Sequence, residues 1–158
     1  MVDDEKVGFI LPQGATGFYQ SKDAPPPETD LRAFRGALYA AARSAGGEVG
    51  EVEEQAYPRT FHIASVVDRE GEGIVLCHAC HPWIAFAQER REWYSEEFVA
   101  PPPWAGTFTQ AGFEVFDREQ LTTPLSDVNT SILTQGEWRQ IRAYGITTLG
   151  GVIFNAWD

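Results

Sequence analysis

Both cysteines of the chain and two of its three histidines lie within one run, residues 77–81, which reads Cys-His-Ala-Cys-His. These side chains can ligate a metal, attach a haem or supply a nucleophile. No other run of this length in the sequence holds as many possible metal ligands of these types. Three interpretations are open: a haem-attachment motif, part of a metal site, or core side chains on a buried strand. The rest of the chain favours core side chains or an incomplete metal site.

The haem interpretation rests on the C-x-x-C-H pattern, in which two thiols bind the vinyl groups and His81 would ligate the iron. Haem attachment normally follows export, but the N-terminal residues are acidic where a signal peptide would be basic. Met1 is the only methionine, which leaves His62 or His78 as the sixth ligand. These features make covalent haem the weaker of the two cofactor hypotheses.

The metal interpretation depends on a β-hairpin. Residues 60–67 alternate between two faces, residues 73–81 read as a returning strand, and a charged, Gly-rich turn separates them. Side chains alternate along a strand, so every second residue shares a face. If the turn is centred on residues 70–71, His62 lies opposite Ala79 and shares a face with one cysteine and one histidine.

Each possible register gathers three of the four ligands that tetrahedral zinc requires. The candidate sets are His62, Cys77 and His81 or, after a shift of one residue, His62, His78 and Cys80. Against zinc, a single C-x-x-C is half of a structural signature, and diagonal neighbours on a sheet lie about 7–8 Å apart. We therefore expect buried free cysteines and no cofactor, with zinc as the alternative.

Catalytic motifs are weak in this chain. It contains no phosphate-binding G-x-x-x-x-G-K-[ST] loop, no G-x-S-x-G elbow and no H-E-x-x-H pair. A thiol activated by His62 or His81 is conceivable, but no oxyanion loop or orienting residue is identifiable. These observations favour a protein that is not an enzyme; an enzyme whose site is assembled from scattered residues is the remaining alternative.

The length, net charge and composition of the chain restrict the class of protein and the kind of partner. A chain of 158 residues has the length of one domain, so we expect residues 1–158 to form a single globular domain. The formal net charge of −11 disfavours nucleic acid and anionic membranes as partners. No apolar run could span a bilayer and no signal peptide is evident, which predicts a cytoplasmic location. The excess of arginine over lysine indicates a GC-rich, bacterial genome.

The pattern of elements predicts an α+β fold with a mainly antiparallel sheet, because strands and helices do not alternate regularly. We expect one long N-terminal helix at about 30–45, capped by Thr29 and closed by glycine at 46–47. A capping box of Thr134 and Glu137 predicts a short C-terminal helix at about 135–142. Besides the hairpin, the expected strands are residues 7–11, 83–88, 113–116 and 152–154, while 89–98 is ambiguous.

Two stretches combine acidic and aromatic side chains. One contains Trp93, Tyr94, Glu96 and Glu97, and the other contains Glu51, Glu53, Glu54 and Tyr57. Aromatic rings supply anchor area and carboxylates supply steering, which suits a surface that binds a basic protein. In a bacterium, such a protein could be an inhibitor that covers the basic active site of a toxin, as immunity proteins do. This hypothesis requires the acidic side chains to gather on one face.

Overall fold

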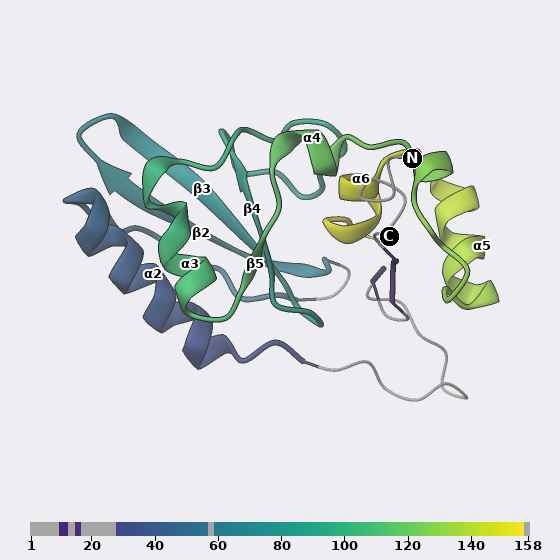
Figure 1. Ribbon diagram of the computed structural model, residues 1–158, viewed down its shortest axis with the longest axis horizontal. Coiled ribbons are helices and arrows are strands. Elements are labelled where there is room, and N and C mark those ends of the chain that lie inside the picture. Colours follow the sequence, from purple (N-terminus) through teal and green to yellow (C-terminus); the bar gives the residue numbers. More distant parts are fainter. Residues whose placement is uncertain (1–9, 13–14, 17–27, 57–58, 157–158) are drawn as a thin grey trace, which may run out of the picture.

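A five-stranded sheet forms the centre of the computed structural model, which describes residues 10–12, 15–16, 28–56 and 59–156 (Figure 1). In chain order, the elements are α2 (Leu31–Ala45), β1 (Glu48–Val49), β2 (Phe61–Asp68), β3 (Gly71–His78), β4 (Trp83–Ala87), η1 (Pro103–Ala105), α3 (Gly106–Gln110), β5 (Glu114–Val115), α4 (Arg118–Leu121), η2 (Leu125–Asp127), α5 (Gln135–Tyr144) and α6 (Leu149–Ile153). The predicted α+β class is confirmed. Among the described residues, no helix is both long and apolar enough to cross a bilayer.

The strands follow one another across the sheet in sequence order, β1-β2-β3-β4-β5. All neighbours are antiparallel except β4 and β5, which run parallel. The predicted hairpin is formed by β2 and β3, with Asp68 opposite Gly71 at its tip. Gly71 has φ 124°, a conformation that side chains with a Cβ rarely adopt, so glycine is favoured at this turn.

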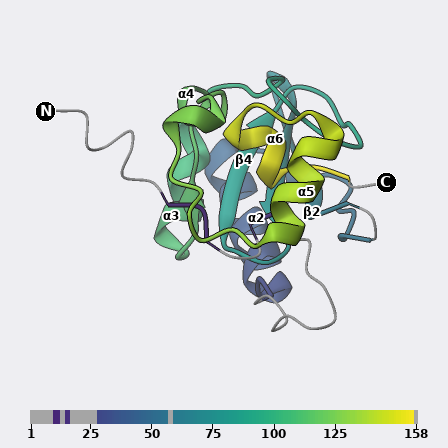
Figure 2. The same ribbon diagram turned by 90° about the vertical axis from the view of Figure 1, so that its right-hand side faces the viewer.

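Both faces of the sheet are buried, which explains why β3 and β4 are almost continuously apolar. Alternate strand residues point into two separate cores. The α2-side core includes Phe34, Leu38, Ala64, Val66, Val75, Cys77, Ile84, Phe86 and Phe108. The α5-side core includes Phe61, Ile63, Ile74, Leu76, Trp83, Ala85, Tyr94, Ile141, Val152, Ile153 and Phe154. In Figure 2, α5 and α6 lie on the near side of β4 and α2 on the far side.

The long N-terminal helix α2 forms where its apolar stripe predicted, but its cap differs. The side chain of Asp30, rather than Thr29, accepts a hydrogen bond from the backbone N–H of Ala33. Thr29 instead donates its backbone N–H to the carbonyl of Ala79, which ties the start of the helix to the turn after β3. The helix ends at Gly46 in the left-handed conformation, as expected of a C-terminal glycine.

The short C-terminal helix α5 begins with the predicted capping box. Thr134 accepts from the backbone N–H of Glu137, and the Glu137 carboxylate accepts from the backbone N–H of Thr134. The other carboxylate oxygen of Glu137 accepts from the Thr16 hydroxyl at 2.6 Å. One fully buried carboxylate therefore caps α5 and anchors a segment from the N-terminal part of the chain.

The predicted strand at residues 152–154 is wrong, because this segment is in helix α6 and its end. The Thr148 side chain caps α6 by accepting from the backbone N–H of Gly151. A Cβ on Gly150 would overlap the Phe98 ring, so only glycine allows the helix to pack this closely. A short apolar run buried on all sides looks the same in a strand and in a helix, which explains the error.

The four other predicted segments have different outcomes. Trp83–Ala87 and Glu114–Val115 are strands, within the ranges expected. The ambiguous stretch 89–98 is not helical but forms a connection, and Phe98 pairs with Ala87 at its end. Most of the first predicted strand, 7–11, lies outside the described residues.

Gly47, the second residue after α2, provides a test of how the end of this helix packs against β2. A Cβ on Gly47 would collide with the backbone carbonyl of Val67 on β2, whereas a Cβ on Gly36, inside α2, meets nothing within 4 Å. We expect Gly47→Ala to lower the free energy of unfolding by about 1–3 kcal/mol through this clash. Gly36→Ala should raise it by up to ~1 kcal/mol because alanine favours a helix. Urea denaturation measures both, and equal effects of the two variants would contradict the packing of α2 against β2.

Candidate functional site

His78, the second residue of the Cys–His run, is fully buried. Its Nε2 lies 2.8 Å from the carbonyl oxygen of Ala15. Its Nδ1 accepts from the backbone N–H groups of Cys80, at 3.0 Å, and His81, at 3.2 Å. Because Nδ1 accepts, the neutral ring carries its proton on Nε2 and donates it to Ala15.

Burial keeps this imidazole neutral. Desolvation, reinforced by the neighbouring His81, lowers the pKa of His78 from 6.5 to about 3. The ring is enclosed by aromatic side chains, with its centroid 5.1 Å from that of Trp83 and 6.3 Å from that of Phe154. His78 therefore acts as a connector that fixes the turn after β3 and the segment around Ala15.

The hairpin register differs from both registers considered for a metal site. His62 lies opposite Cys77, two residues from the expected partner Ala79. His62 and Cys77 thus share the face that packs on α2, where the His62 ring stacks on Phe34 with 6.1 Å between centroids. His62 Nδ1 accepts from the backbone N–H of Gln55 at 2.8 Å.

This register divides both predicted zinc sets. In the first set, His81 follows the end of β3 and stacks on Trp83 of the other core, with 4.4 Å between ring centroids. In the second set, His78 lies opposite Phe61, the residue next to His62 on β2. Because side chains alternate along a strand, His62 and His78 are on opposite faces of the sheet. Within the ranges that the structure describes, no group of three or more His, Cys, Asp or Glu side chains could hold a metal ion.

The two thiols have separate environments. Cys77 is fully buried in the α2-side core, and burial raises its pKa. Cys80 borders a cavity of about 330 Å³ together with His81, Glu28 and Asp30. Burial, followed by the charges of Glu28 and Glu137, raises the pKa of Cys80 to about 11. Both cysteines are free thiols, and their surroundings disfavour the thiolate that a nucleophile or a haem linkage needs.

Arg90, three residues before Trp93, binds the acidic stretch around Glu51 and Glu53. Its guanidinium donates to the carbonyl of Glu51 at 2.6 Å and lies 3.6 Å from the Glu53 carboxylate. Arg59 also pairs with Glu53 at 3.5 Å, and Arg35 pairs with Glu54 at 2.9 Å. Two of the five acids predicted to bind a partner, Glu53 and Glu54, are therefore already paired with arginines of this chain.

The aromatic residues of these stretches have opposite environments. Trp93 is 51% exposed, whereas Tyr94 is fully buried in the α5-side core, so Tyr94 is not available to a partner. The Tyr94 hydroxyl donates to the carbonyl of Glu89 at 2.6 Å and accepts from the backbone N–H of Arg91. Tyr57 lies outside the described residues. Among the described residues of these stretches, Trp93 is thus the exposed aromatic anchor.

Glu96 and Glu97 remain exposed beside Trp93. The Glu97 carboxylate accepts from the backbone N–H groups of Ser95 and Glu96. These bonds, chiefly the one from Ser95, lower the pKa of Glu97 below its ordinary value and keep it ionised. We call Glu51, Glu53, Glu54, Trp93, Glu96 and Glu97 the Trp93 surface.

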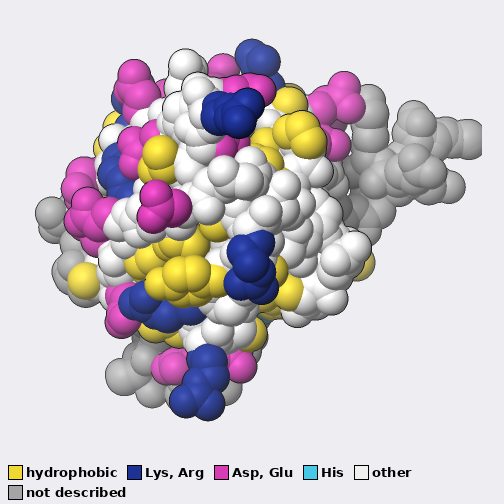
Figure 3. Space-filling model, turned by 90° about the vertical axis from the view of Figure 1, so that its left-hand side faces the viewer, with side chains coloured by type: hydrophobic (Ala, Val, Ile, Leu, Met, Phe, Trp, Pro, Cys, Tyr) yellow, Lys and Arg dark blue, Asp and Glu magenta, His cyan; other side chains and the backbone are white. Residues whose placement is uncertain are grey.

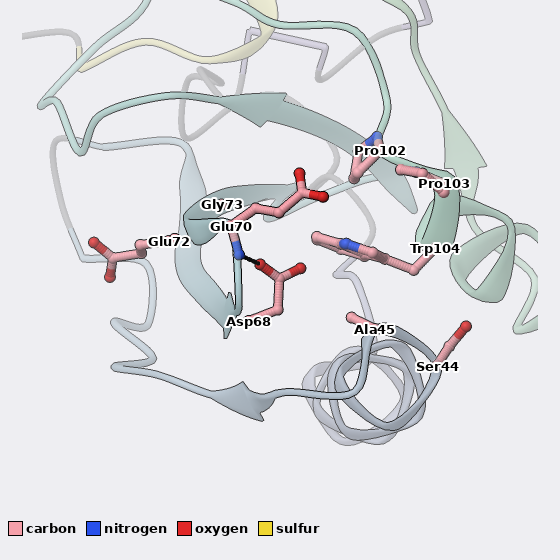
Figure 4. A pocket seen from close by; sticks show the side chains of 10 residues that line it. Ser44, Ala45, Asp68, Glu70, Glu72, Gly73, Pro102, Pro103 and Trp104 are labelled. Atoms are coloured by element: carbon pink, nitrogen blue, oxygen red, sulfur yellow. Dashed lines mark hydrogen bonds between the residues drawn. The ribbon is translucent and has the colours of Figure 1, made fainter.

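At one end of the molecule, the acidic side chains share the surface with basic and hydrophobic groups (Figure 3). Figure 3 shows the end of the molecule that carries the hairpin tip, and there acidic and basic side chains are interspersed around exposed hydrophobic groups. The sequence analysis missed a cavity of about 430 Å³ at this tip. Its lining includes Asp68, Glu70, Glu72, Pro102, Pro103 and Trp104 (Figure 4). The local sequence signal was a tryptophan directly after three prolines.

The chain matches no protein-family model, no curated protein and no solved structure.

The buried neutral His78 predicts a loss of stability in acid. Between pH 6.5 and about 3, the imidazole of the unfolded chain binds a proton that the folded imidazole does not. Protons therefore favour unfolding in this window, and stability that is present above pH 6.5 is lost as the pH falls. We expect His78 to contribute a slope of roughly 1.4 kcal/mol per pH unit. Urea denaturation at a series of pH values measures it.

His78→Phe serves as the control, because it keeps an aromatic ring and removes the titration. It leaves Ala15, Cys80 and His81 without their hydrogen-bond partner, so we expect a loss of about 2–4 kcal/mol at pH 7. The slope between pH 3 and 6.5 should also be shallower than in the wild type. An unchanged slope would show that His78 is not held neutral.

The raised pKa of Cys80 predicts slow alkylation. At pH 7.5, iodoacetamide should modify the folded protein at least about tenfold more slowly than the protein in urea, because few thiols are ionised. Mass spectrometry follows the reaction at each cysteine, and Cys80→Ser identifies the signal. Rapid modification of Cys80 in the folded protein would restore the hypothesis of a thiol nucleophile.

Proposed function

We propose that this chain is a non-enzymatic, acidic protein-binding module that covers a basic site of a partner protein, in the manner of a bacterial inhibitor or immunity protein. The observation that carries the proposal is Trp93, a large aromatic ring that is 51% exposed and is followed, three and four residues later, by the exposed carboxylates of Glu96 and Glu97. Buried aromatic anchors supply most of the binding energy at protein interfaces, and a rim of carboxylates selects a basic partner.

The charge of the chain supports a basic partner. With a net charge of −11, the whole molecule attracts cationic proteins over a distance of about one Debye length, ~10 Å at 0.1 M salt. Glu53 and Glu54 contribute less to this attraction than Glu96 and Glu97 because arginines of the chain pair with them. Those internal pairs hold the stretch around residues 51–54 against Arg90, and so give the Trp93 surface a fixed shape.

The test uses the purified chain as bait in an extract of its native host. A basic protein should be retained, released by salt, and then shown to bind the purified chain by calorimetry. Trp93→Ala should weaken that binding at least ~10-fold, as expected for an aromatic anchor. Tyr39→Ala is the matched control, because Tyr39 is also an exposed ring, 55% exposed on α2, but lies outside the Trp93 surface.

Two results would contradict the proposal. One is the failure to recover any basic partner, together with normal survival of a strain that lacks the gene. The other is an equal loss of affinity for Trp93→Ala and Tyr39→Ala, which would mean that the Trp93 surface has no special part in binding.

A further inference from the structure

An indole, carboxylates and the end of a helix meet in one cavity at the tip of the β2–β3 hairpin. The cavity, of about 430 Å³, lies between the hairpin turn, the last turn of α2 and η1. Figure 4 shows the Trp104 ring beside the Asp68 carboxylate of the hairpin and above Ala45 of α2. The carboxylates of Asp68 and Glu70 lie on the hairpin side of the ring, whereas Glu72 points away from it.

The Trp104 ring is held in place by the core beneath it. Its centroid is 5.6 Å from that of Phe86, in a T-shaped arrangement at 83°, and 6.4 Å from that of Phe108. Gly73 of β3 has no side chain, and even a Cβ there would be in contact with the indole, at 3.5 Å. Trp104 is nevertheless only half-buried, so a pre-positioned part of the ring remains open to the cavity.

The chemistry of the cavity favours a cation. Neither Asp68 nor Glu70 forms a salt bridge with an arginine in the part of the chain that the structure describes. The negative end of the α2 dipole borders the same space, and an indole attracts cations over its face. Arg43 and Arg69 are exposed nearby in sequence but do not line the cavity.

We infer that this cavity receives the guanidinium group of an arginine from the basic partner; the inference rests on the proposed function. A planar guanidinium can stack on the indole while it donates two hydrogen bonds to a carboxylate, whereas a lysine ammonium is a compact charge with no plane to stack. One Asp68 oxygen already accepts from the backbone N–H of Glu70 at 2.8 Å, which fixes the carboxylate in orientation.

The segment that carries Glu51, Glu53 and Glu54 of the Trp93 surface starts near the hairpin tip, where the cavity lies. The segment that contains β1 runs beside β2, with Glu48 opposite Val67 near the hairpin tip and Glu53 opposite Ile63 at the other end. The hydrophobic groups exposed at this end of the molecule are visible in Figure 3. A partner that contacts Trp93 and the edge strand could therefore extend one arginine to Trp104.

The experiment titrates the full chain with Nα-acetyl-arginine amide and follows the Trp104 indole N–H by NMR. Nα-acetyl-citrulline amide, which has the same shape without the charge, is the ligand control. Arginine should shift the Trp104 signal saturably, and citrulline should not. The double variant Asp68→Asn with Glu70→Gln should weaken arginine binding at least ~5-fold, because charge-assisted hydrogen bonds are lost.

The matched control is Glu114→Gln with Glu119→Gln, which changes the net charge equally at exposed positions outside the cavity. It should bind arginine like the wild type. Absence of a saturable shift, an equal response to citrulline, or an equal loss in both double variants would overturn the inference.

The two proposals can fail separately. If the partner binds through Trp93 but is insensitive to Asp68→Asn with Glu70→Gln, the arginine cavity is wrong and the protein-binding function stands. If free arginine binds at Trp104 while no basic partner exists, the cavity is real and the proposed function is wrong.

Discussion

A single neutral imidazole holds together the region in which the candidate chemistry lies. His78 bonds to three backbone groups, so it fixes the turn between β3 and β4 and the segment at Ala15 together. Next to that segment, Thr16 bonds to the buried carboxylate that caps α5. A protonated or metal-bound His78 could not accept these N–H bonds at Nδ1 and remain in this apolar site. The hydrogen-bond network that this ring supports thus gives the histidine of the C-x-x-C-H run a structural role.

The distribution of ion pairs decides which acids are available to a partner. The arginines at 35, 59 and 90 are directed at Glu53 and Glu54, so that part of the negative charge is balanced within the chain. Such pairs at the surface add little stability, but they fix the geometry of neighbouring groups. Glu96 and Glu97 near Trp93, and Asp68 and Glu70 near Trp104, form no salt bridge with the described arginines. The two proposals therefore involve the same chemistry, a partly exposed indole and carboxylates outside these salt bridges, one in the connection after β4 and the other at the hairpin tip.

Local signals in the sequence predicted much of the fold and little of the site. Three local signals involve residues close in the chain: the apolar stripe of α2, the capping box of α5 and the alternation of the hairpin strands. Each of these elements formed where expected. The errors arose where local patterns are ambiguous. Residues 152–154 are all apolar, so the spacing of apolar residues alone could not distinguish a strand from a helix. The hairpin register depended on a turn centred one residue earlier than assumed, and this divided both proposed ligand sets.

The sequence by itself determined the α+β class, the two capped helices, the central hairpin and the excess of negative charge. Tertiary structure decided that Tyr94 is buried and Trp93 exposed, that His78 reaches a carbonyl 63 residues away, and that Glu54 meets an arginine 19 residues away. It also brought Trp104 to the hairpin tip. The physical reason is that caps and alternation involve neighbours in the chain, whereas burial and pairing depend on which distant segments the two cores bring into contact.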